Sequence, residues 1–310
     1  MLTGEPRRLP RVGIVGVGYL GRFHALKHMK LGTLACVYDA NREQANKVAE
    51  ETGVSVSASL EHLLSNVDAV VCASTTTTHF DVAKQALERK LPLFIEKPMT
   101  SDVTTARQLE EFSRSAGLLV QVGHIERFNP AYQWIKENCR ECSLLRFKRW
   151  APFRERGADV NVVRDVMIHD IDLALDFFGE EPTRIVATGA KGPSGDWDLV
   201  EAEFFFSKNA RVMISANRMA AKIERSVEAY QGGRWWHVDL GSLSVSRFEK
   251  IGAEVKTTEM LLEKRDALEA EAADFVESVV SRRTPSVTAR DGLNALIYAS
   301  KIESALAGAD

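Results

Sequence analysis

A glycine-rich turn near the beginning of the chain, Gly16-Val17-Gly18-Tyr19-Leu20-Gly21, constrains the fold more than any other feature. It follows the β-branched run Val12–Val17, which predicts a buried strand, and it precedes a helical pattern. In such a strand–turn–helix unit, the first glycine permits the tight turn and the second lets the backbone approach a pyrophosphate, while the third lets the helix pack closely. The six residues of the turn therefore predict a dinucleotide-binding site. The alternative is a turn of the same shape that binds no ligand.

An aspartate follows the second predicted strand. Asp39 comes directly after Leu34–Tyr38, where a carboxylate accepts hydrogen bonds from the ribose hydroxyls and repels a 2′-phosphate. Arg42 lies close enough in the sequence to soften that preference. We therefore expect a cofactor site that includes Asp39 and Arg42 and favours NAD over NADP.

The first part of the chain alternates short β-branched runs with helical segments. Strands are predicted over residues 12–17, 34–38, 69–73, 93–95 and 118–122, and helices over residues 22–29, 42–52, 79–89 and 104–116. Such alternation is typical of a parallel sheet with helices on both faces. Residues 1–123 are therefore predicted to form an α/β, doubly wound Rossmann domain that binds NAD.

The pattern changes after Gly123. One long helix is expected over Val162–Phe178, and strand-like runs follow at residues 184–188, 200–206, 211–216, 226–230, 235–240 and 243–247, with helices over 264–282 and 290–307. Strands joined by short turns pair antiparallel. We therefore expect residues 124–310 to form an α+β domain for substrate binding and oligomerisation, with a large open, mainly antiparallel sheet. The uncovered face of an open sheet predicts a homodimer or homotetramer.

The bulk composition is ordinary for a globular protein, with 45% hydrophobic and 27% charged residues among 310. A formal net charge of −3 gives no long-range attraction to nucleic acid or to an anionic membrane. The sequence shows no signal-peptide core and no apolar run of transmembrane length. We therefore expect a cytoplasmic protein whose partners include neither nucleic acid nor a membrane.

The four cysteines do not form a disulfide framework typical of small secreted proteins. Cys36 and Cys72 fall in apolar strand-like runs and are expected to be small core residues. Cys139 and Cys142 form one CxxC pair in a polar stretch, without a second pair or a set of histidines nearby. We therefore expect no bound metal and no redox role for this pair.

A second group of chemically useful residues ends the strand at Phe94-Ile95, in the segment Glu96-Lys97-Pro98. Open α/β sheets bind ligands beyond the carboxyl ends of their strands, so Glu96 and Lys97 are expected to face the cofactor site. Pro98 restricts Lys97 to an extended backbone, which would direct its side chain. The alternative is a solvated Glu–Lys pair before a helix.

The predicted helix over Val162–Phe178 carries a stripe of ionisable residues. Asp165, His169, Asp172 and Asp176 follow one another at spacings of four, three and four, which places them on one face of an otherwise apolar helix. An aspartate one turn from a histidine can raise the basicity of the imidazole, which suits a general base. The alternatives are a salt-bridge network or an exposed strip, and we expect Asp176, near the helix end, to be structural.

At these residues the chain resembles the oxidoreductase family of glucose-fructose oxidoreductase, inositol dehydrogenase and MocA (Gfo/Idh/MocA). The resemblance covers nearly the whole length and rests on the glycine turn with Asp39, on Glu96-Lys97-Pro98 and on Asp165-x-x-x-His169. It implies oxidation or reduction of a sugar, cyclitol or related centre with NAD or NADP. It further implies a catalytic trio of Lys97, Asp165 and His169, and a cofactor-lining loop containing Thr75, Thr76 and His79.

A narrower resemblance comes from the segment Gly123-His124-Ile125-Glu126-Arg127-Phe128-Asn129-Pro130, taken together with residues 165–170. These segments look like the family branch that contains UDP-N-acetylglucosamine 3-dehydrogenases. In that branch the 3-keto sugar passes to a partner aminotransferase, which gives a diamino sugar for lipid A or surface polysaccharide. The resemblance implies substrate contacts from seven residues: Lys97, His124, Arg127, Phe128, Asn129, Arg164 and His169.

Several alternatives stay open at this point. Arg127 and Arg164 would contact the phosphates of the nucleotide, or they would instead form ion pairs. The substrate would be a UDP-sugar, or instead a free sugar, an inositol or a tetrapyrrole such as biliverdin. The chain could instead belong to another functional class, as a non-catalytic NAD-binding redox sensor, although such a sensor would not need Lys97 and His169.

Overall fold

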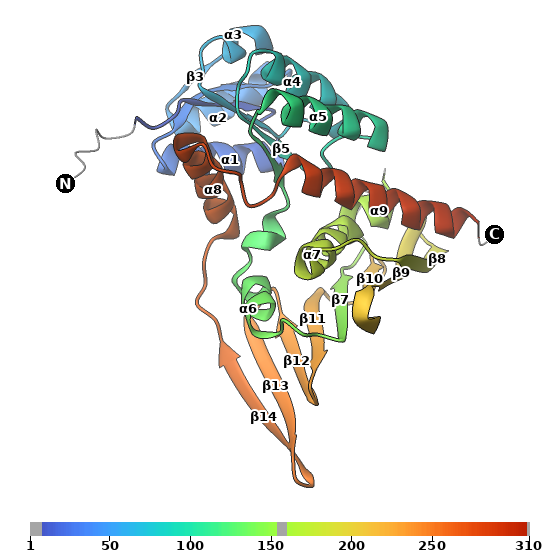
Figure 1. Ribbon diagram of the computed structural model, residues 1–310. Coiled ribbons are helices and arrows are strands. Elements are labelled where there is room, and N and C mark those ends of the chain that lie inside the picture. The colour runs from blue at the N-terminus through green and yellow to red at the C-terminus, as the bar shows by residue number, and fades with distance from the viewer. Residues whose placement is uncertain (1–7, 154–159, 309–310) are drawn as a thin grey trace. The chain divides into compact units, whose positions relative to one another are not determined.

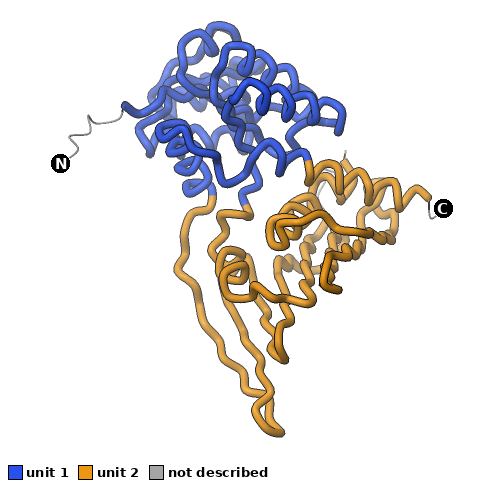
Figure 2. The backbone as a smooth tube through the Cα atoms, viewed as in Figure 1, with its two compact units in different colours: residues 1–125, 268–293 blue, residues 126–267, 294–310 orange. Residues whose placement is uncertain are grey.

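The computed structural model describes residues 8–153 and 160–308. The chain divides into two compact units, which Figure 2 distinguishes by colour. Unit 1 comprises residues 1–125 and 268–293, and unit 2 comprises residues 126–267 and 294–310. Within the described ranges, no helix combines the length and the apolar character that a membrane span requires.

Unit 1 contains a six-stranded parallel sheet in the order β3-β2-β1-β4-β5-β6. Figure 1 labels β3 and β5 of this sheet. The strands are β1 Val12–Val15, β2 Leu34–Tyr38, β3 Ser55–Val56, β4 Ala69–Cys72, β5 Leu93–Glu96 and β6 Val120–Gly123. The helices between them are α1 Tyr19–Lys30, α2 Arg42–Thr52, α3 Leu60–Leu64, α4 Thr76–Glu88 and α5 Val103–Ala116. This strand order reverses between β1 and β4 and confirms the predicted doubly wound Rossmann fold.

A late segment of the chain completes unit 1. Helix α8, Ala267–Ser281, places the fully buried Phe275 against Phe94 of β5, with 5.9 Å between ring centroids. Further along, Val122 of β6 donates its backbone N–H to the carbonyl oxygen of Val287 at 3.1 Å. These residues follow the whole sheet of unit 2 in sequence, yet they pack on the Rossmann sheet.

Unit 2 contains an eight-stranded sheet in the order β14-β13-β12-β11-β7-β10-β9-β8. The strands are β7 Leu144–Trp150, β8 Arg184–Lys191, β9 Trp197–Phe205, β10 Arg211–Asn217, β11 Glu224–Gln231, β12 Arg234–Asp239, β13 Ser244–Ile251 and β14 Glu254–Leu261. Only β7 and β10 pair in parallel among the described strand pairs of this sheet. The mainly antiparallel sheet is confirmed, whereas β7 and β14 were not predicted.

One face of this sheet is buried under helices. The alternation along β7 turns Leu145, Phe147 and Arg149 inward, while their neighbours stay half-buried. The core that they join contains side chains from α6 Pro130–Asn138, from α7 Ile168–Phe178 and from the second half of α9 Ala289–Ala307. The one long helix expected over Val162–Phe178 is in fact two segments, a π-helical turn at Val163–Met167 followed directly by α7.

The cysteines divide into two kinds. Cys36 and Cys72 are buried in the strands of unit 1, as predicted. Cys139 and Cys142 are joined in a disulfide between α6 and β7, and both are buried. The sequence pattern did not predict this bond, because a polar stretch gave no sign that the pair would lie inside unit 2.

A buried ionic cluster lies beneath the sheet of unit 2. Arg149 donates from Nε and Nη2 to the carboxylate of Asp170 at 2.7–3.1 Å, and from Nη1 to Glu126 at 2.7 Å. The guanidinium side chain is 8% exposed and that of Asp170 is 1% exposed. Burial raises the pKa of Asp170, although the charge of Arg149 opposes that rise. Removal of the arginine would leave two carboxylates without their cation.

We predict that Arg149→Met lowers the free energy of unfolding of unit 2 by about 3 to 5 kcal/mol, because a buried pair would lose one partner. The matched control is Arg211→Met on the neighbouring strand β10, whose side chain is 48% exposed and pairs with Glu203, which is 32% exposed. It should cost about 1 kcal/mol or less. All five tryptophans lie in unit 2, so urea unfolding followed by tryptophan fluorescence measures this unit. Equal losses in the two variants would contradict the prediction.

Candidate functional site

The three glycines of the turn after β1 differ in their surroundings. Gly16 has φ of +82°, and a Cβ there would overlap the backbone of Ser74. A Cβ on Gly21 would overlap the carbonyl oxygen of Gly16, so the helix begins against the turn itself. A Cβ on Gly18 would meet nothing within 4 Å. The turn is therefore closed on the protein side and open at Gly18, where a ligand can approach the backbone.

Two side chains hold this turn in shape. Asp39 accepts a hydrogen bond at Oδ2 from the backbone N–H of Val17 and at Oδ1 from that of Asn41, each at 2.8 Å. Gln44 donates from Nε2 to the carbonyl oxygen of Val17 at 2.8 Å. Sequence reasoning missed Gln44, because a glutamine inside a helix carries no positional signal. The Arg42 guanidinium donates to the carbonyl oxygen of Ser57 at 2.9 Å, which holds it beside β3.

The beginning of α1 fits the phosphates of a dinucleotide. The helix starts at Tyr19 with Gly18 as its N-cap, so no side chain caps the first amides, and the first turn holds no acidic residue. Tyr19 is 63% and Leu20 40% exposed. The N–H groups of a first helical turn and the positive end of the helix dipole favour an anion. With the Asp39 carboxylate beside Val17, these donors and acceptors match a pyrophosphate and a ribose.

The loop after β4 is tied to the end of β5 by a histidine. His79 is 1% exposed, with Nδ1 at 3.0 Å from the carbonyl oxygen of Pro98 and Nε2 at 3.1 Å from that of Ser74. Burial lowers the pKa of His79 below 6.5, although both carbonyls oppose that shift. The exposed Thr75 is the N-cap of α4, and Thr76 begins that helix. The structure therefore gives His79 backbone partners, while a cofactor contact from Thr75 and Thr76 stays a prediction.

Glu96 and Lys97 end β5 at the carboxyl edge of the Rossmann sheet. Glu96 is 8% exposed, which excludes the solvated pair considered above. Its Oε1 lies 2.7 Å from Nε2 of His24, and its Oε2 accepts a hydrogen bond from the backbone N–H of Lys97 at 3.1 Å. Lys97 is half-buried and is joined to Pro98 by a cis peptide bond. On the neighbouring strand, a Cβ on Gly123 would come within 2.8 Å of Glu96 Oε2, so glycine provides the room for this carboxylate.

In unit 2, Asp165 lies in the π-helical turn, and His169 follows it on α7. Single π-turns inside helices are frequent at functional sites. The Asp165 carboxylate lies 3.8 Å from Nη1 of Arg218, a residue that sequence reasoning missed. Arg218 is buried, and its Nη2 lies 2.8 Å from the fully buried carboxylate of Asp198. His169 is half-buried, like Asp165.

The two arginines proposed as phosphate contacts form ion pairs, the alternative that the sequence left open. Arg127 donates to Asp172 from Nε at 2.8 Å and from Nη2 at 2.6 Å, and its Nη1 reaches Asp176 at 3.1 Å. Arg164 pairs in the same way with Glu303 of α9, at 2.7 and 2.8 Å. Asp176, which pairs with Arg127, also pairs with Lys136. Substrate contacts from either arginine stay predictions.

The rest of the 123–130 segment is held by backbone and core contacts. Asn129 caps α6 through the backbone N–H of Ala131 and donates to the carbonyl oxygen of Leu240 at 3.0 Å. His124 is 1% and Phe128 7% exposed. Of the predicted substrate contacts, Lys97, Arg127, Arg164 and His169 combine partial exposure with a charged or titratable group.

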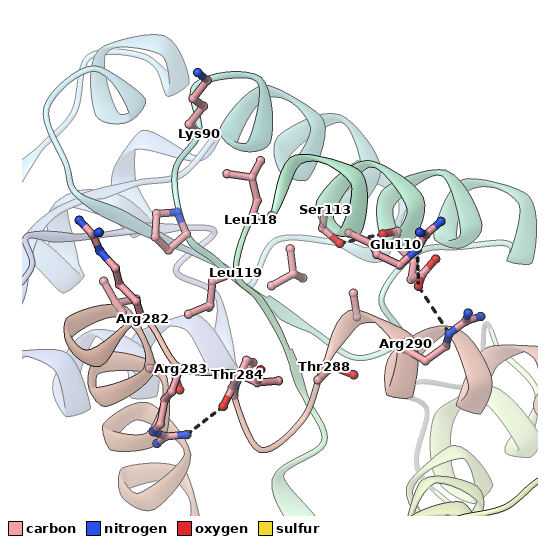
Figure 3. Close-up of a pocket in the computed structure, with 18 residues that line it drawn as sticks. Lys90, Glu110, Ser113, Leu118, Leu119, Arg282, Arg283, Thr284, Thr288 and Arg290 are labelled. Atoms are coloured by element: carbon pink, nitrogen blue, oxygen red, sulfur yellow. Dashed lines mark hydrogen bonds and ion pairs between the residues drawn. The ribbon is translucent and has the colours of Figure 1, made fainter.

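A pocket of about 770 Å³ lies elsewhere on unit 1, beside α5 and the α8–α9 connection (Figure 3). Pro92 and Leu118–Val120, at the starts of β5 and β6, form part of its lining, so it is not at the carboxyl edge where the glycine turn lies. Figure 3 shows Lys90 and Arg282 at its margins with their side chains directed away from its middle. None of the predicted site residues lines it.

Comparison with known proteins assigns both units. Residues 10–124 match an oxidoreductase family with an NAD-binding Rossmann fold, and residues 133–231 match the GFO/IDH/MocA C-terminal domain. The chain is 33% identical to the UDP-N-acetylglucosamine 3-dehydrogenase of Acidithiobacillus ferrooxidans over 280 residues, which are 88% of this chain and 90% of that relative. It is 26% identical to the myo-inositol 2-dehydrogenase of Thermotoga maritima, over 94% of this chain and 95% of the relative.

Solved structures agree with these matches. A structure of the A. ferrooxidans UDP-N-acetylglucosamine 3-dehydrogenase superposes with a TM-score of 0.91 at 33% identity, over 96% of this chain and 98% of that one. The scyllo-inositol dehydrogenase of Lactobacillus casei, solved with bound NAD(H) and scyllo-inositol, has a TM-score of 0.82 at 20% identity, over 98% of both chains. The second likeness shows the shared fold alone.

We predict that Gly18→Ala weakens NADH binding about tenfold or more while leaving the melting temperature of the protein unchanged, because a methyl group there meets solvent instead of protein. Gly21→Ala is the contrasting control, since its methyl group would overlap Gly16 and should lower the melting temperature. Fluorescence titration with NADH and thermal unfolding give the two readouts. Unchanged NADH affinity in a folded Gly18→Ala protein would show that the cofactor does not approach the turn.

Proposed function

Because this chain belongs to the Gfo/Idh/MocA oxidoreductase family, we propose that it oxidises the C3 hydroxyl of UDP-N-acetylglucosamine to the 3-keto sugar. It is an NAD-dependent dehydrogenase that acts on a CH–OH group. The observation that carries the narrower proposal is the 33% identity, over nearly the whole chain, to a protein named for this reaction. Lys97, Asp165 and His169 supply the chemistry that such a reaction needs.

The Rossmann unit binds the cofactor. The open backbone at Gly18 and the first amides of α1 would hold the pyrophosphate, and the Asp39 carboxylate would accept hydrogen bonds from the ribose. When bound, NAD accepts the hydride that leaves the oxidised carbon. The protein's own contribution is to bind the sugar, to remove one proton and to stabilise the oxygen that loses it.

We assign the proton transfer to His169. Its imidazole would take the proton of the C3 hydroxyl as a general base. Asp165, four residues earlier in the π-helical turn that precedes α7, would stabilise the imidazolium that forms. Arg218 and the buried Asp198 hold Asp165 in turn, since Arg218 lies 3.8 Å from one carboxylate and 2.8 Å from the other.

We assign stabilisation of the oxygen to Lys97. Its ammonium would donate a hydrogen bond to the C3 oxygen while negative charge develops there, and that oxygen becomes the ketone of the product. Lys97 belongs to unit 1, whereas Asp165 and His169 belong to unit 2. That these groups meet at one substrate is part of the proposal.

A second candidate function is the oxidation of an inositol, which the match to myo-inositol 2-dehydrogenase favours. The same lysine and histidine would serve a ring hydroxyl of a cyclitol without a nucleotide. A non-catalytic NAD sensor is less well supported, because the chain retains both the lysine and the histidine. Action in the cytoplasm, and transfer of the product to an aminotransferase for lipid A or surface polysaccharide, follow from the resemblance and belong to the proposal.

We further propose that the chain forms a homodimer or homotetramer through the outer face of the eight-stranded sheet. Three aromatic side chains on neighbouring strands, Tyr230, Trp235 and Phe248, form a stack with ring centroids 6.1 and 4.3 Å apart. All three are half-buried and lie on the face opposite the core. A second copy covering this face would bury the apolar area that the stack exposes.

We predict that kcat/KM with UDP-N-acetylglucosamine exceeds that with free N-acetylglucosamine or myo-inositol by about a hundredfold or more, since remote binding energy from the uridine diphosphate would be used at the reacting carbon. The measurement is NADH formation at 340 nm with the three substrates. A comparable or higher value with myo-inositol would replace the proposed function by the second candidate.

We predict that Lys97→Met lowers kcat by about 10²- to 10³-fold and that His169→Ala lowers it by about 10²- to 10⁴-fold. The affinity for NADH should change little in both. Matched controls are Lys84→Met and His62→Ala, which alter the same residue types at exposed helical positions of unit 1. Near-normal turnover in a folded Lys97→Met or His169→Ala protein would show that these roles are misassigned.

A further inference from the structure

Three ionisable side chains that take no direct part in the proposed reaction are buried together in unit 1. His24 on α1, Glu96 at the end of β5 and Glu271 on α8 are 1%, 8% and 0% exposed. One nitrogen or oxygen atom of each lies within 4.8 Å of the corresponding atoms of the other two. A cluster of this kind costs free energy to bury, so its protonation and its partners must be accounted for.

Glu271 is the least satisfied member of the cluster. Among the described residues, neither of its carboxyl oxygens has a hydrogen-bond partner. Burial raises the pKa of Glu271 well above its ordinary value, and the nearby charges of Glu96 and Asp274 raise it further. A carboxyl group in this setting keeps its proton at neutral pH and becomes an O–H donor.

Glu96 has the opposite character. Burial by itself would raise the pKa of Glu96, but the hydrogen bond and charge of His24, together with the charge of Lys97, outweigh it and lower that pKa. Glu96 is therefore the carboxylate, and Glu271 is the acid. The two neighbouring carboxyl groups therefore carry one proton in total, on Glu271, because their environments push the two pKa values apart.

The position of Glu271 is fixed by packing. Phe275 lies one helical turn further along α8, on the same face, and its ring packs on Phe94 of β5. The ring of His24 also packs on Phe94, with centroids 4.9 Å apart. The helices that carry His24 and Glu271 are thus both held against the strand that ends in Glu96.

From these contacts we propose that His24 and Glu271 are positioning residues, which hold the Glu96 carboxylate so that its hydrogen bond to the backbone N–H of Lys97 fixes the lysine at the edge of the sheet. The link from Glu96 to Lys97 is the 3.1 Å hydrogen bond, and Gly123 provides the space for the carboxylate. The inference rests on the proposed function in one respect, the catalytic role of Lys97.

A bound metal is the rival explanation of the same cluster. Two carboxylates and an imidazole are ligands that divalent zinc accepts. However, Nε2 of His24 lies only 2.7 Å from Glu96 Oε1, the distance of a hydrogen bond. Two ligands of a tetrahedral zinc would lie about 3.3 Å apart at bond lengths of about 2.0 Å. The geometry therefore favours a hydrogen bond between His24 and Glu96 over a metal ion bound by both.

The test compares Glu271→Gln with Glu271→Met. Glutamine retains an N–H donor toward Glu96, so its kcat should stay within about threefold of the wild-type value, whereas methionine removes the donor and should lower kcat about 10- to 100-fold with an unchanged KM for NAD. The matched control is Glu110→Met, which removes a buried carboxylate of α5 that pairs with Arg114 and Arg290. If Glu110→Met lowers kcat equally, or if the glutamine variant fails as badly as the methionine variant, the proposal is wrong.

A second readout needs no sugar substrate. The rate at which an N-hydroxysuccinimide acetate reagent acetylates Lys97 in the NADH complex, measured by mass spectrometry, should change several-fold in Glu271→Met and not in Glu271→Gln. The exposed Lys84 is the internal reference. The two variants can still show this difference in the acetylation of Lys97 when the wild-type protein does not oxidise UDP-N-acetylglucosamine. In that case the proposed function fails and the positioning role stands. Wild-type acetylation of Lys97 in Glu271→Met overturns the positioning role.

Two further outcomes complete the test. If Glu271→Met does not fold, His24→Asn applies the same comparison, because the shorter amide cannot reach Glu96 and should alter the acetylation of Lys97 as Glu271→Met would. A divalent metal found by elemental analysis at one equivalent in chelator-free wild-type protein, and absent from Glu271→Gln, would overturn the proposal in favour of a metal site.

Discussion

The carboxylate of Glu96 is the constraint on which unit 1 depends most. It is charged, buried and placed at the edge of the sheet where the cofactor site lies. A charge in that position must have partners. His24 of α1, the backbone N–H of Lys97 and the glycine of β6 meet this need with a donor, a second donor and space. The Glu96 side chain is therefore held in place by contacts from α1, from the backbone of Lys97 and from β6.

Buried charges also have partners in unit 2. Its buried carboxylates each have an arginine: Asp170 has Arg149, Asp172 has Arg127 and Asp198 has Arg218. Two of these aspartates belong to α7, directly after His169. The buried pairs fix that helix against the sheet, while Asp165 and His169 stay half-buried and able to contact a ligand. Firm support beneath the proposed acid/base pair would suit the precise positioning of a substrate.

The parts of the fold that sequence predicts are those with local causes. Local sequence patterns predict the glycine turn, the position of Asp39 after β2 and the alternating strands, because each depends on residues close together in the chain. Strand β14, Glu254–Leu261, has no apolar alternation because nearly all of it is exposed, and it was missed for that reason. His169, Asp172 and Asp176 lie on one α-helix, but Asp165 lies in the π-helical turn before it, and residue spacing cannot distinguish a π-turn from an α-turn.

The missing parts of the site depend on contacts between distant segments. No pattern in the sequence near Glu96 predicts Glu271, which reaches unit 1 only because α8 returns to the Rossmann sheet after the eight-stranded sheet of unit 2. Arg218 follows β10, and only the folded sheet brings it to Asp165. Arg127 and Arg164 show the reverse problem. Basic residues beside a resemblance to nucleotide-sugar enzymes suggest phosphate contacts, yet carboxylates from other helices already occupy both guanidinium groups.

The proposed reaction removes a hydride from C3 of UDP-N-acetylglucosamine and transfers it to NAD. The decisive experiment uses UDP-N-acetylglucosamine that carries deuterium at C3, incubated with the enzyme and NAD and followed by mass spectrometry of the reduced cofactor. We expect a reduced cofactor that carries one deuterium and a sugar nucleotide that has lost it. Unlabelled NADH formed from this substrate, or no NADH at all, would rule the proposed reaction out.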